Sequence, residues 1–144
     1  MTTLNPYLSF RDNAKEAMTF YQSVFGGEFT SLFRFRDLPI EGVTLTEEQS
    51  NQIMHIGMRI DGGTRLMGND SLPMFGKNLQ PGNTVYLSVS PDSKEEADRV
   101  FSALSAGGEV ETPMADQSWG DYYGALTDKF GVQWMVNFEQ TGQG

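Results

Sequence analysis

His55 is the only histidine in this 144-residue chain, and an imidazole ring can take up and release a proton near neutral pH. Arg59 follows on the same side of a predicted strand and could hold an anionic group. His55 and Arg59 are therefore candidate catalytic residues for acid–base chemistry on a small molecule. The alternative for His55 is a hydrogen-bonded structural residue, and the sequence leaves both interpretations open.

Strand alternation predicts which side chains accompany His55, because successive side chains of a strand point to opposite faces. In residues 53–60, the apolar side chains alternate with His55, Gly57 and Arg59. The apolar face, with Met54 and Met58, is expected to pack on a helix. The same alternation predicts that the ligand-binding residues line one groove: Asn5, Tyr7, Ser9, His55, Arg59, Met67, Tyr122, Gln133 and Met135. Arg65, Asn69 and Asn137 are expected to face the same groove. Trp119 is either a lid or stacking residue of this groove, or a core residue at a sheet edge.

The elements that hold these strands occur twice in the sequence. Residues 7–9 and 86–88 both read Y-L-S, and Gly26-Gly27-Glu28 returns as Gly107-Gly108-Glu109. Between these matches lie two apolar stripes of helical spacing, predicted as helices 13–25 and 93–105, which coincide at an offset of about 80 residues. Asp12 or Asn13 could cap the first helix, and S-K-E-E at 93–96 is a capping box for the second.

The later strands also match between the two copies, and this match assigns their faces. Gly57 aligns with Gly124, and Asp61 aligns with Asp128. This alignment makes Tyr122 the repeat partner of His55 and places it in the groove.

The repeat predicts an α+β fold of two βαβββ modules curled around a shared groove. The modules are residues 1–70 and 83–144, joined by a connector at 71–82, and together they form a single domain over 1–144. Gly62-Gly63 is the expected hairpin turn, and residues 36–52 are an excursion or loop of the first module. The strands are expected at 4–10, 28–35, 53–60, 64–69, 84–89, 109–115, 119–127 and 132–138.

Composition limits the partners that this chain can have. The net charge is −9, which argues against nucleic acid, because phosphate contacts require clustered Lys and Arg. No apolar run approaches the length of a membrane span, and the first residues do not resemble a secretory signal. The absence of Cys excludes disulfides and thiol chemistry and fits a cytoplasmic location.

Several motifs resemble the vicinal oxygen chelate superfamily, which includes glyoxalase I, fosfomycin and bleomycin resistance proteins and extradiol dioxygenases. N-P-Y-L-S-F-R-D-N-A-K-E-A-M-T-F-Y-Q-S-V-F-G-G, I-M-H-I-G-M-R-I, L-M-G-N-D and W-G-D-Y-Y-G-A-L-T-D-K-F-G-V-Q-W are similar to its PhnB-like branch. The resemblance covers essentially the whole chain and implies the paired βαβββ architecture. The branch carries a methyltransferase label, but the sequence has no glycine-rich loop of the kind that would hold a methyl donor.

The resemblance also implies a place for a divalent metal, on the first and last strands of each module. The matching positions are Asn5, Thr84, Met67 and Met135. A hard divalent ion prefers carboxylate, imidazole or water, so we expect no metal and no cofactor. Met67 and Met135 would then fill the groove, although a metal borrowed through Asp121 or Glu28 is an alternative.

Three functions are compatible with this sequence. The first is binding of a small organic molecule in the groove without a metal, and a cationic or aromatic guest would suit an acidic groove with aromatic walls. The second is a metal-dependent lyase or isomerase similar to glyoxalase, and the third is an interaction module without a ligand. We also expect a homodimer, because open sheet edges must be paired or shielded and the excursion is too apolar for a purely solvated loop.

Overall fold

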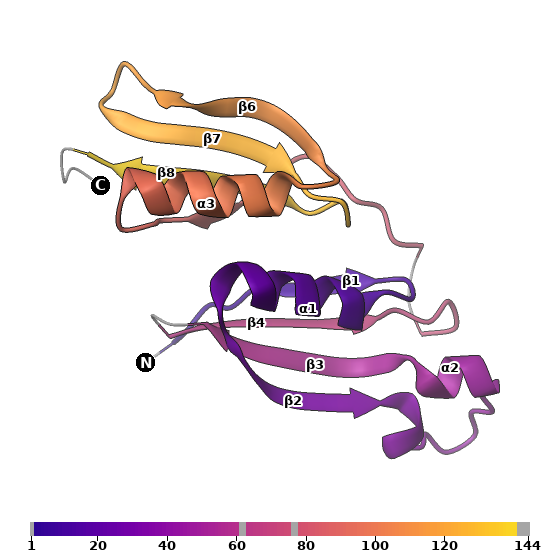
Figure 1. The fold of residues 1–144 in the computed structure, drawn as a ribbon. Helices are drawn as coiled ribbons and strands as arrows, with labels where there is room; N and C mark the ends of the chain where they lie inside the picture. Colours follow the sequence, from indigo (N-terminus) through magenta and orange to yellow (C-terminus); the bar gives the residue numbers. More distant parts are fainter. Residues whose placement is uncertain (1, 61–62, 76–77, 141–144) are drawn as a thin grey trace. The chain divides into compact units, whose positions relative to one another are not determined.

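A helix lies on one face of a four-stranded sheet in each half of the chain (Figure 1). The computed structural model describes residues 2–60, 63–75 and 78–140. It divides into two units, Met1–Gln80 and Pro81–Gly144, each of which is described by itself below. The two βαβββ modules predicted from the repeat are confirmed.

The first unit has strand order β1-β4-β3-β2, with β1 parallel to β4 and the other pairs antiparallel. Its elements are β1 (Tyr7–Phe10), α1 (Ala14–Phe25), β2 (Glu28–Arg34), β3 (Ile53–Ile60) and β4 (Thr64–Asp70). The second unit has the same topology, β5-β8-β7-β6. Its elements are β5 (Leu87–Val89), α3 (Lys94–Ser105), β6 (Glu109–Asp116), β7 (Asp121–Thr127) and β8 (Gln133–Glu139).

The apolar stripes of both helices form the cores of the units, as their coincidence in sequence predicts. Ala17 and Tyr21 of α1 are fully buried, and so are Ala97 and Leu104 of α3. Both helices are followed by a glycine with positive φ, at Gly26 and Gly107, which only a residue without Cβ adopts readily.

The start of α1 differs from the predicted cap. Asn13 occupies the N-cap position, but within the described residues its side chain makes no cap hydrogen bond. The Ala14 N–H instead donates to Asp70 Oδ1 at 2.9 Å, and the Ile53 N–H donates to Asp70 Oδ2 at 2.9 Å. Asp70 therefore ties the start of α1 and the start of β3 to the end of β4.

At the start of α3, one of the two hydrogen bonds of the predicted capping box is present. The Glu96 N–H donates to Ser93 Oγ at 3.1 Å. The Glu96 carboxylate accepts from Arg99 instead of returning to Ser93.

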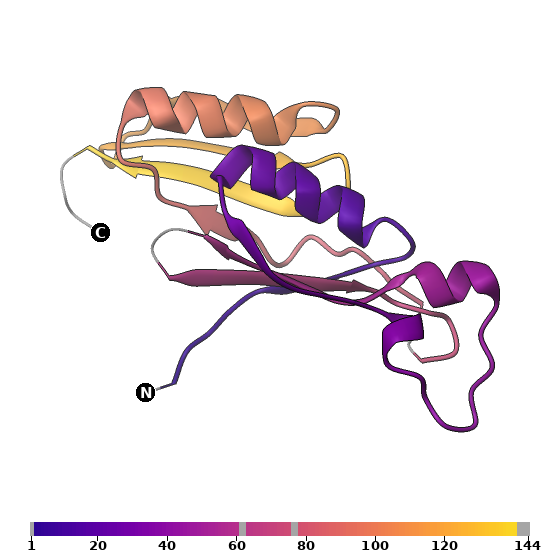
Figure 2. The same ribbon diagram turned by 60° about the horizontal axis from the view of Figure 1, so that its bottom comes forward.

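Residues 36–52 are more ordered than the predicted loop (Figure 2). A 3-10 turn at Phe35–Asp37 begins one residue before this segment, and a short helix α2 follows at Glu47–Asn51. Thr46 and Gln49 form a reciprocal capping box at the start of α2, a signal in T-E-E-Q that the sequence analysis missed.

The two hairpin turns are described to different extents. Of the predicted turn Gly62-Gly63, Gly62 lies outside the described residues, as do Asp61 and positions 76 and 77 of the connector, whereas Gly63 has φ 92°. In the second unit, Asp128 Oδ1 accepts from the N–H groups of Phe130 and Val132 at 2.8 and 3.0 Å. Asp128 Oδ2 accepts from Trp134 Nε1 at 2.8 Å, so one buried carboxylate fixes the turn between β7 and β8.

Candidate functional site

We call the side of each sheet opposite its own helix the helix-free face. On the first sheet, Met58 is fully buried on the helix side, and its side chain lies beside Gly27 at the end of α1. A Cβ added at Gly57 would lie 2.8 Å from Ser31 Oγ and 3.4 Å from His55 Nε2. Gly57, Ser31 and His55 therefore share the helix-free face, and the predicted register of β3 is confirmed.

Cross-strand pairing arranges the helix-free face of the first sheet in rows. One row runs through Tyr7, Met67, Gly57 and Ser31. The row on one side contains Arg65, Arg59 and Glu28, and the row on the other side contains the pairs Ser9–Asn69 and Phe33–His55. Rows two residues apart on a strand are separated by roughly 7 Å, so the three rows span the size of a small organic molecule.

Tyr7 and His55 are in direct contact across this face. The Tyr7 hydroxyl lies 3.4 Å from His55 Nδ1, a long hydrogen bond, and the two ring centroids are 5.7 Å apart. Burial raises the pKa of the Tyr7 phenol above its usual value, so this hydroxyl keeps its proton near neutral pH. His55 therefore has a polar partner, and its second ring nitrogen, Nε2, is the one on the side of Gly57 and Ser31.

Two arginines stand directly opposite each other in the next row. Arg59 of β3 pairs in register with Arg65 of β4, and both side chains are exposed. Like charges in directly opposed cross-strand positions repel each other. Glu28 on the other side of Arg59 compensates in part, and a bound anion would relieve the remaining repulsion.

Two buried polar atoms on this face are unpaired. Ser31 Oγ and Asn69 Oδ1 have no hydrogen-bond partner among the described residues. Buried polar atoms normally have a partner, so these two stand out on this face, where a water molecule or a local side-chain movement would be needed to complete their hydrogen bonding.

The remaining predicted residues of this unit lie close by. Asn5 precedes β1, and its Oδ1 accepts from the Arg65 N–H at 3.2 Å. Ser9 is exposed, and Met67 is half-buried in the row of Tyr7.

The positions that correspond to the superfamily's metal site do not fit a hard divalent ion. Asn5 offers an amide oxygen that already accepts a hydrogen bond, Thr84 is exposed, and Met67 and Met135 offer thioethers. Among the described residues, no three His, Asp or Glu side chains gather in an arrangement that could hold a metal. Glu28 lies beside Arg59, and Asp121 Oδ2 accepts from Asn137 Nδ2 at 3.0 Å.

The predicted face of Tyr122 in the second unit is wrong. The Tyr122 hydroxyl donates to Asp98 Oδ1 of α3 at 2.6 Å, and Lys94 Nζ of α3 lies 4.8 Å from its ring centroid. A Cβ added at Gly124 would lie 2.8 Å from Phe101 Cε2 of α3. Tyr122 and Gly124 therefore face the helix.

The reason is a register error of one residue. Met67 pairs with Gly57, whereas Met135 pairs with Ala125, so Ala125 and not Gly124 corresponds to Gly57. A slip of one residue exchanges the two faces of a strand. Tyr123 takes the place on the helix-free face that the alignment gave to Tyr122.

Three other predicted residues of the second unit have defined surroundings. Gln133 is 8% exposed, and its Nε2 donates to the Val85 carbonyl at 2.8 Å. Met135 is half-buried and pairs with Ser88. Trp119 is 61% exposed and therefore not a core residue; its ring meets Tyr123 edge-on at 6.1 Å.

Sequence reasoning missed a cluster on this second helix-free face. The Tyr86 hydroxyl donates to Glu111 Oε2 at 2.5 Å, and the Thr127 hydroxyl donates to Glu111 Oε1 at 2.8 Å. Glu111 stands at a register shift between Val110 and Thr112. A β-bulge re-aims a side chain, and no simple alternation in the sequence reveals it.

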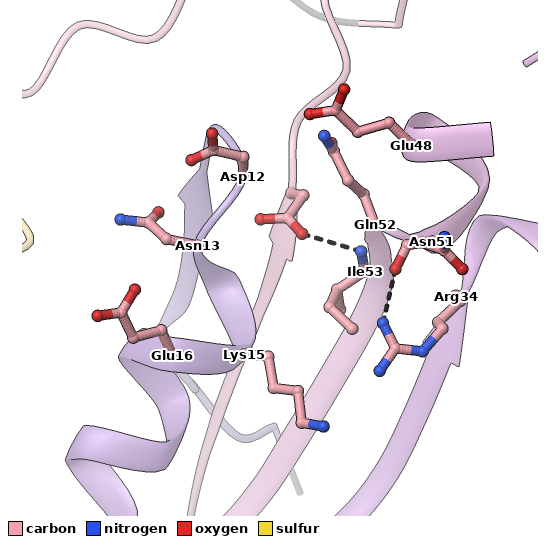
Figure 3. A pocket seen from close by; sticks show the side chains of 10 residues that line it. Asp12, Asn13, Lys15, Glu16, Arg34, Glu48, Asn51, Gln52 and Ile53 are labelled. Carbon is pink, nitrogen blue, oxygen red and sulfur yellow. Dashed lines mark hydrogen bonds between the residues drawn. The ribbon is translucent and has the colours of Figure 1, made fainter. Parts of the chain in front are cut away.

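A polar hollow of about 330 Å³ lies at the N-terminal end of α1 (Figure 3). Residues of both charges surround it, from α1, β2, α2, β3 and the end of β4: Asp12, Asn13, Lys15, Glu16, Arg34, Glu48, Asn51, Gln52, Ile53 and Asp70. Arg34 donates to the Asn51 carbonyl at 2.6 Å, and Asp70 is occupied by two backbone N–H groups. These contacts fasten α2 and α1 to the sheet, so we read the hollow as structural.

Known structures share this fold. The crystal structure of a glyoxalase/bleomycin resistance protein/dioxygenase family enzyme from Burkholderia phytofirmans PsJN superposes with a TM-score of 0.61 at 20% identity, over 96% of its chain and 94% of this one. The paired βαβββ units therefore have the glyoxalase-like fold of the vicinal oxygen chelate superfamily.

Closer relatives define the family within that superfamily. The family model described as 3-demethylubiquinone-9 3-methyltransferase matches residues 2–137. Protein YjdN of Escherichia coli (strain K12) is 33% identical over 141 residues, which is 93% of each chain. The crystal structure of protein PA1353 from Pseudomonas aeruginosa superposes with a TM-score of 0.83 at 33% identity, covering 96% of this chain and 98% of that one. The PhnB protein from Bacillus cereus superposes with a TM-score of 0.76 at 27% identity, covering 95% and 99%. This chain belongs to the family of this model, the PhnB-like family, and it has the glyoxalase-like fold.

Proposed function

We propose that this chain binds a small organic molecule on the helix-free face of the first sheet, without the divalent metal of its superfamily. The observation that carries the proposal is the opposed pair Arg59–Arg65 in the row next to Tyr7 and Met67. Two opposed guanidinium groups repel each other, whereas both attract a carboxylate or phosphate and can donate hydrogen bonds to it. The preferred molecule therefore carries an anionic group.

The neighbouring rows suit the rest of such a molecule. Met67 and Phe33 offer apolar surface, while the exposed Ser9 and the ring of His55 offer polar groups. A few polar groups within an apolar surface are typical of small-molecule sites. His55, held by Tyr7, would then lie against the bound molecule and could exchange a proton with it.

Binding can be tested with a set of aromatic carboxylates and their matched primary amides, observed by amide shifts in NMR. We expect the carboxylates to shift residues of β3 and β4, and to bind at least tenfold more tightly than the amides. Arg59→Gln and Arg65→Gln should each weaken carboxylate binding at least tenfold. Lys15→Gln, which removes an exposed charge from α1, should leave it unchanged.

The same screen separates the competing functions. Carboxylate and amide binding of equal strength, or no binding by any compound, would contradict the proposal and favour an interaction module. Metal analysis of the purified protein tests the metal-free part. A stoichiometric divalent ion, removed by chelators with loss of binding, would favour the lyase or isomerase alternative.

We propose in addition that the chain forms a homodimer. β1 and β2 are the edge strands of the first sheet, and Pro6, which lacks an amide donor, directly precedes β1. Leu38 and Ile40 in the segment 35–52 are 44% and 43% exposed, which supports a second copy of the chain covering these apolar side chains in the dimer. Light scattering at micromolar concentration should give the mass of two chains. A mass of one chain that is unchanged on concentration would reject the dimer.

A further inference from the structure

The Tyr86–Glu111–Thr127 cluster is built from opposite edges of the second sheet. Tyr86 directly precedes β5 at one edge, Glu111 belongs to β6 at the other edge, and Thr127 is at the end of β7. Both carboxylate oxygens of Glu111 accept a hydroxyl proton, at 2.5 and 2.8 Å. The carboxylate is therefore fixed in orientation on the helix-free face although it is exposed.

A count of donors and acceptors defines what this cluster can bind. A carboxylate accepts at about four lone-pair positions, of which the two hydroxyls use two. The hydroxyl protons of Tyr86 and Thr127 are both donated to Glu111. Toward a ligand these two hydroxyls can therefore only accept hydrogen bonds. The cluster thus presents several acceptors, one negative charge and no side-chain donor. Such a set selects a ligand group that is rich in N–H donors and positively charged.

The charge state of the cluster supports this count. The hydroxyls of Tyr86 and Thr127 lower the pKa of Glu111, so its carboxylate is ionised at neutral pH. The hydrogen bond to Glu111 raises the pKa of the Tyr86 phenol, so that the phenol stays neutral.

The strands around the cluster are acidic throughout. β5, β6, β7 and β8 contain no Lys or Arg, but they carry Glu109, Glu111, Asp116, Asp121 and Glu139. The basic residues of 81–140 are Lys94 and Arg99 in α3, on the opposite face, and Lys129 in the β7–β8 turn. Lys94 pairs with Asp116 and Arg99 with Glu96, so each of these two already has an acidic partner.

Aromatic surface accompanies the charge. Tyr123 lies on the same face of β7 as Thr127, and its phenol is near enough to Tyr86 to raise that residue's pKa further. Trp119 meets Tyr123 edge-on and is largely exposed. Faces of Tyr and Trp attract a cation and pack well on the apolar stem of an organic amine.

We propose that the helix-free face of the second sheet binds an organic cation, a primary ammonium or guanidinium group on an aromatic or apolar stem, with Glu111 as its counter-ion. Tyr86 and Thr127 hold the Glu111 carboxylate in place, and Tyr123 and Trp119 contact the stem. This site rests on the second sheet alone and does not depend on anion binding by the first.

Phenethylammonium is a suitable probe, with phenethyl alcohol as its neutral match and phenylacetate as its anionic match. NMR titration should shift the amides of Glu111, Tyr123 and Thr127, and the ammonium should bind at least tenfold more tightly than the alcohol. Quenching of Trp119 fluorescence gives a second readout, because Trp134 is buried and Trp119 is exposed.

Variants identify the counter-ion. Glu111→Gln should weaken phenethylammonium binding at least tenfold, and Thr127→Val should weaken it less, because the carboxylate remains. Glu95→Gln removes the same charge from exposed α3 and should leave binding unchanged. Equal binding of the ammonium and the alcohol, unchanged binding by Glu111→Gln, or shifts confined to other strands would overturn the proposal.

Discussion

Asp70 shows how a single side chain can replace the capping residue that the sequence suggests. Its carboxylate is 2% exposed and accepts the first N–H of α1 and the first N–H of β3. Burial raises the pKa of Asp70, whereas its two backbone hydrogen bonds and Arg34 act in the opposite direction. The repeat does not reveal this role, because Asp70 is distant in sequence from both partners and comes together with them only in the folded sheet.

Asp70→Asn should lower the free energy of unfolding by about 1–3 kcal/mol, because an amide has one acceptor oxygen for two backbone donors. Urea unfolding measures this loss at neutral pH. An unchanged midpoint and slope would show that Asp70 does not hold the two elements.

The same residue predicts a pH dependence. The pKa of Asp70 is raised in the folded state, so the folded chain holds this proton more tightly than the unfolded chain. The contribution of Asp70 to stability should therefore increase as pH falls through the raised folded pKa toward the ordinary value of 3.8, and be lost as pH rises. The difference in unfolding free energy between wild type and Asp70→Asn should widen over that acid range, and a narrowing difference would contradict the sign.

At the scale of elements, the two long helices and the strands of both sheets followed from the sequence, whereas α2 and the face of β7 did not. The helices 14–25 and 94–105 begin and end within a residue of their predicted bounds, because caps and glycines are local signals. The pairing of Gly57 with Gly124 was misleading, because identical residues in two strands need not occupy equivalent ladder positions. The bulge at Glu111 and the contacts of Asp70 depend on pairing between strands, which a single sequence does not reveal.

Gly124→Ala tests the corrected register. An added Cβ would lie 2.6 Å from Met114 Sδ and 2.8 Å from Phe101 Cε2, so these side chains of β6 and α3 would have to move away from Gly124 of β7. We expect a loss of about 1–3 kcal/mol in unfolding free energy, typical of overpacking. If Gly124 faced away from α3, as the alignment with Gly57 implied, Phe101 would not report the change in side-chain NMR.

The short helix α2 offers a milder test at the same scale. Thr46→Ala removes the oxygen that accepts the Gln49 N–H at 3.1 Å. We expect a cost of roughly 1 kcal/mol, seen as faster hydrogen exchange within α2. Exchange in α3, which Ser93 caps, serves as the internal control.

At the scale of the whole molecule, one fold has been used twice with a different charge. The strands of the first sheet carry Arg34, Arg59 and Arg65 together with Glu28 and Asp70, whereas those of the second carry acidic residues and no basic ones. Among the described residues, no helix is long and apolar enough to cross a membrane. The net charge of −9 is unevenly divided between the two units, and the two proposed sites would take ligands of opposite charge.

Asp70→Asn and Gly124→Ala should act independently in the whole chain. The contacts of Asp70 belong to residues 1–80 and those of Gly124 to residues 81–144, so the two changes share no partner. The double variant should show the sum of the two losses within about 0.5 kcal/mol. A larger coupling energy, measured by the same urea unfolding, would mean that the units stabilise each other.

The segment 35–52 joins β2 to β3, and residues 117–120 join the equivalent strands β6 and β7 of the second unit. The two sheets have the same topology although these connections differ in length. Arg34 and Arg36 fasten the long version by binding Asn51 at its far end, so the added chain leaves and re-enters the sheet at one point. The short version, with Gly120 at φ 104°, lies at the corresponding point of the other sheet. This connection is therefore a position where the fold accepts an insertion. A foreign recognition loop could be inserted at 117–120 without disturbing the pairing of β6 with β7, if arginine–asparagine hydrogen bonds like those of the first unit were introduced at its ends.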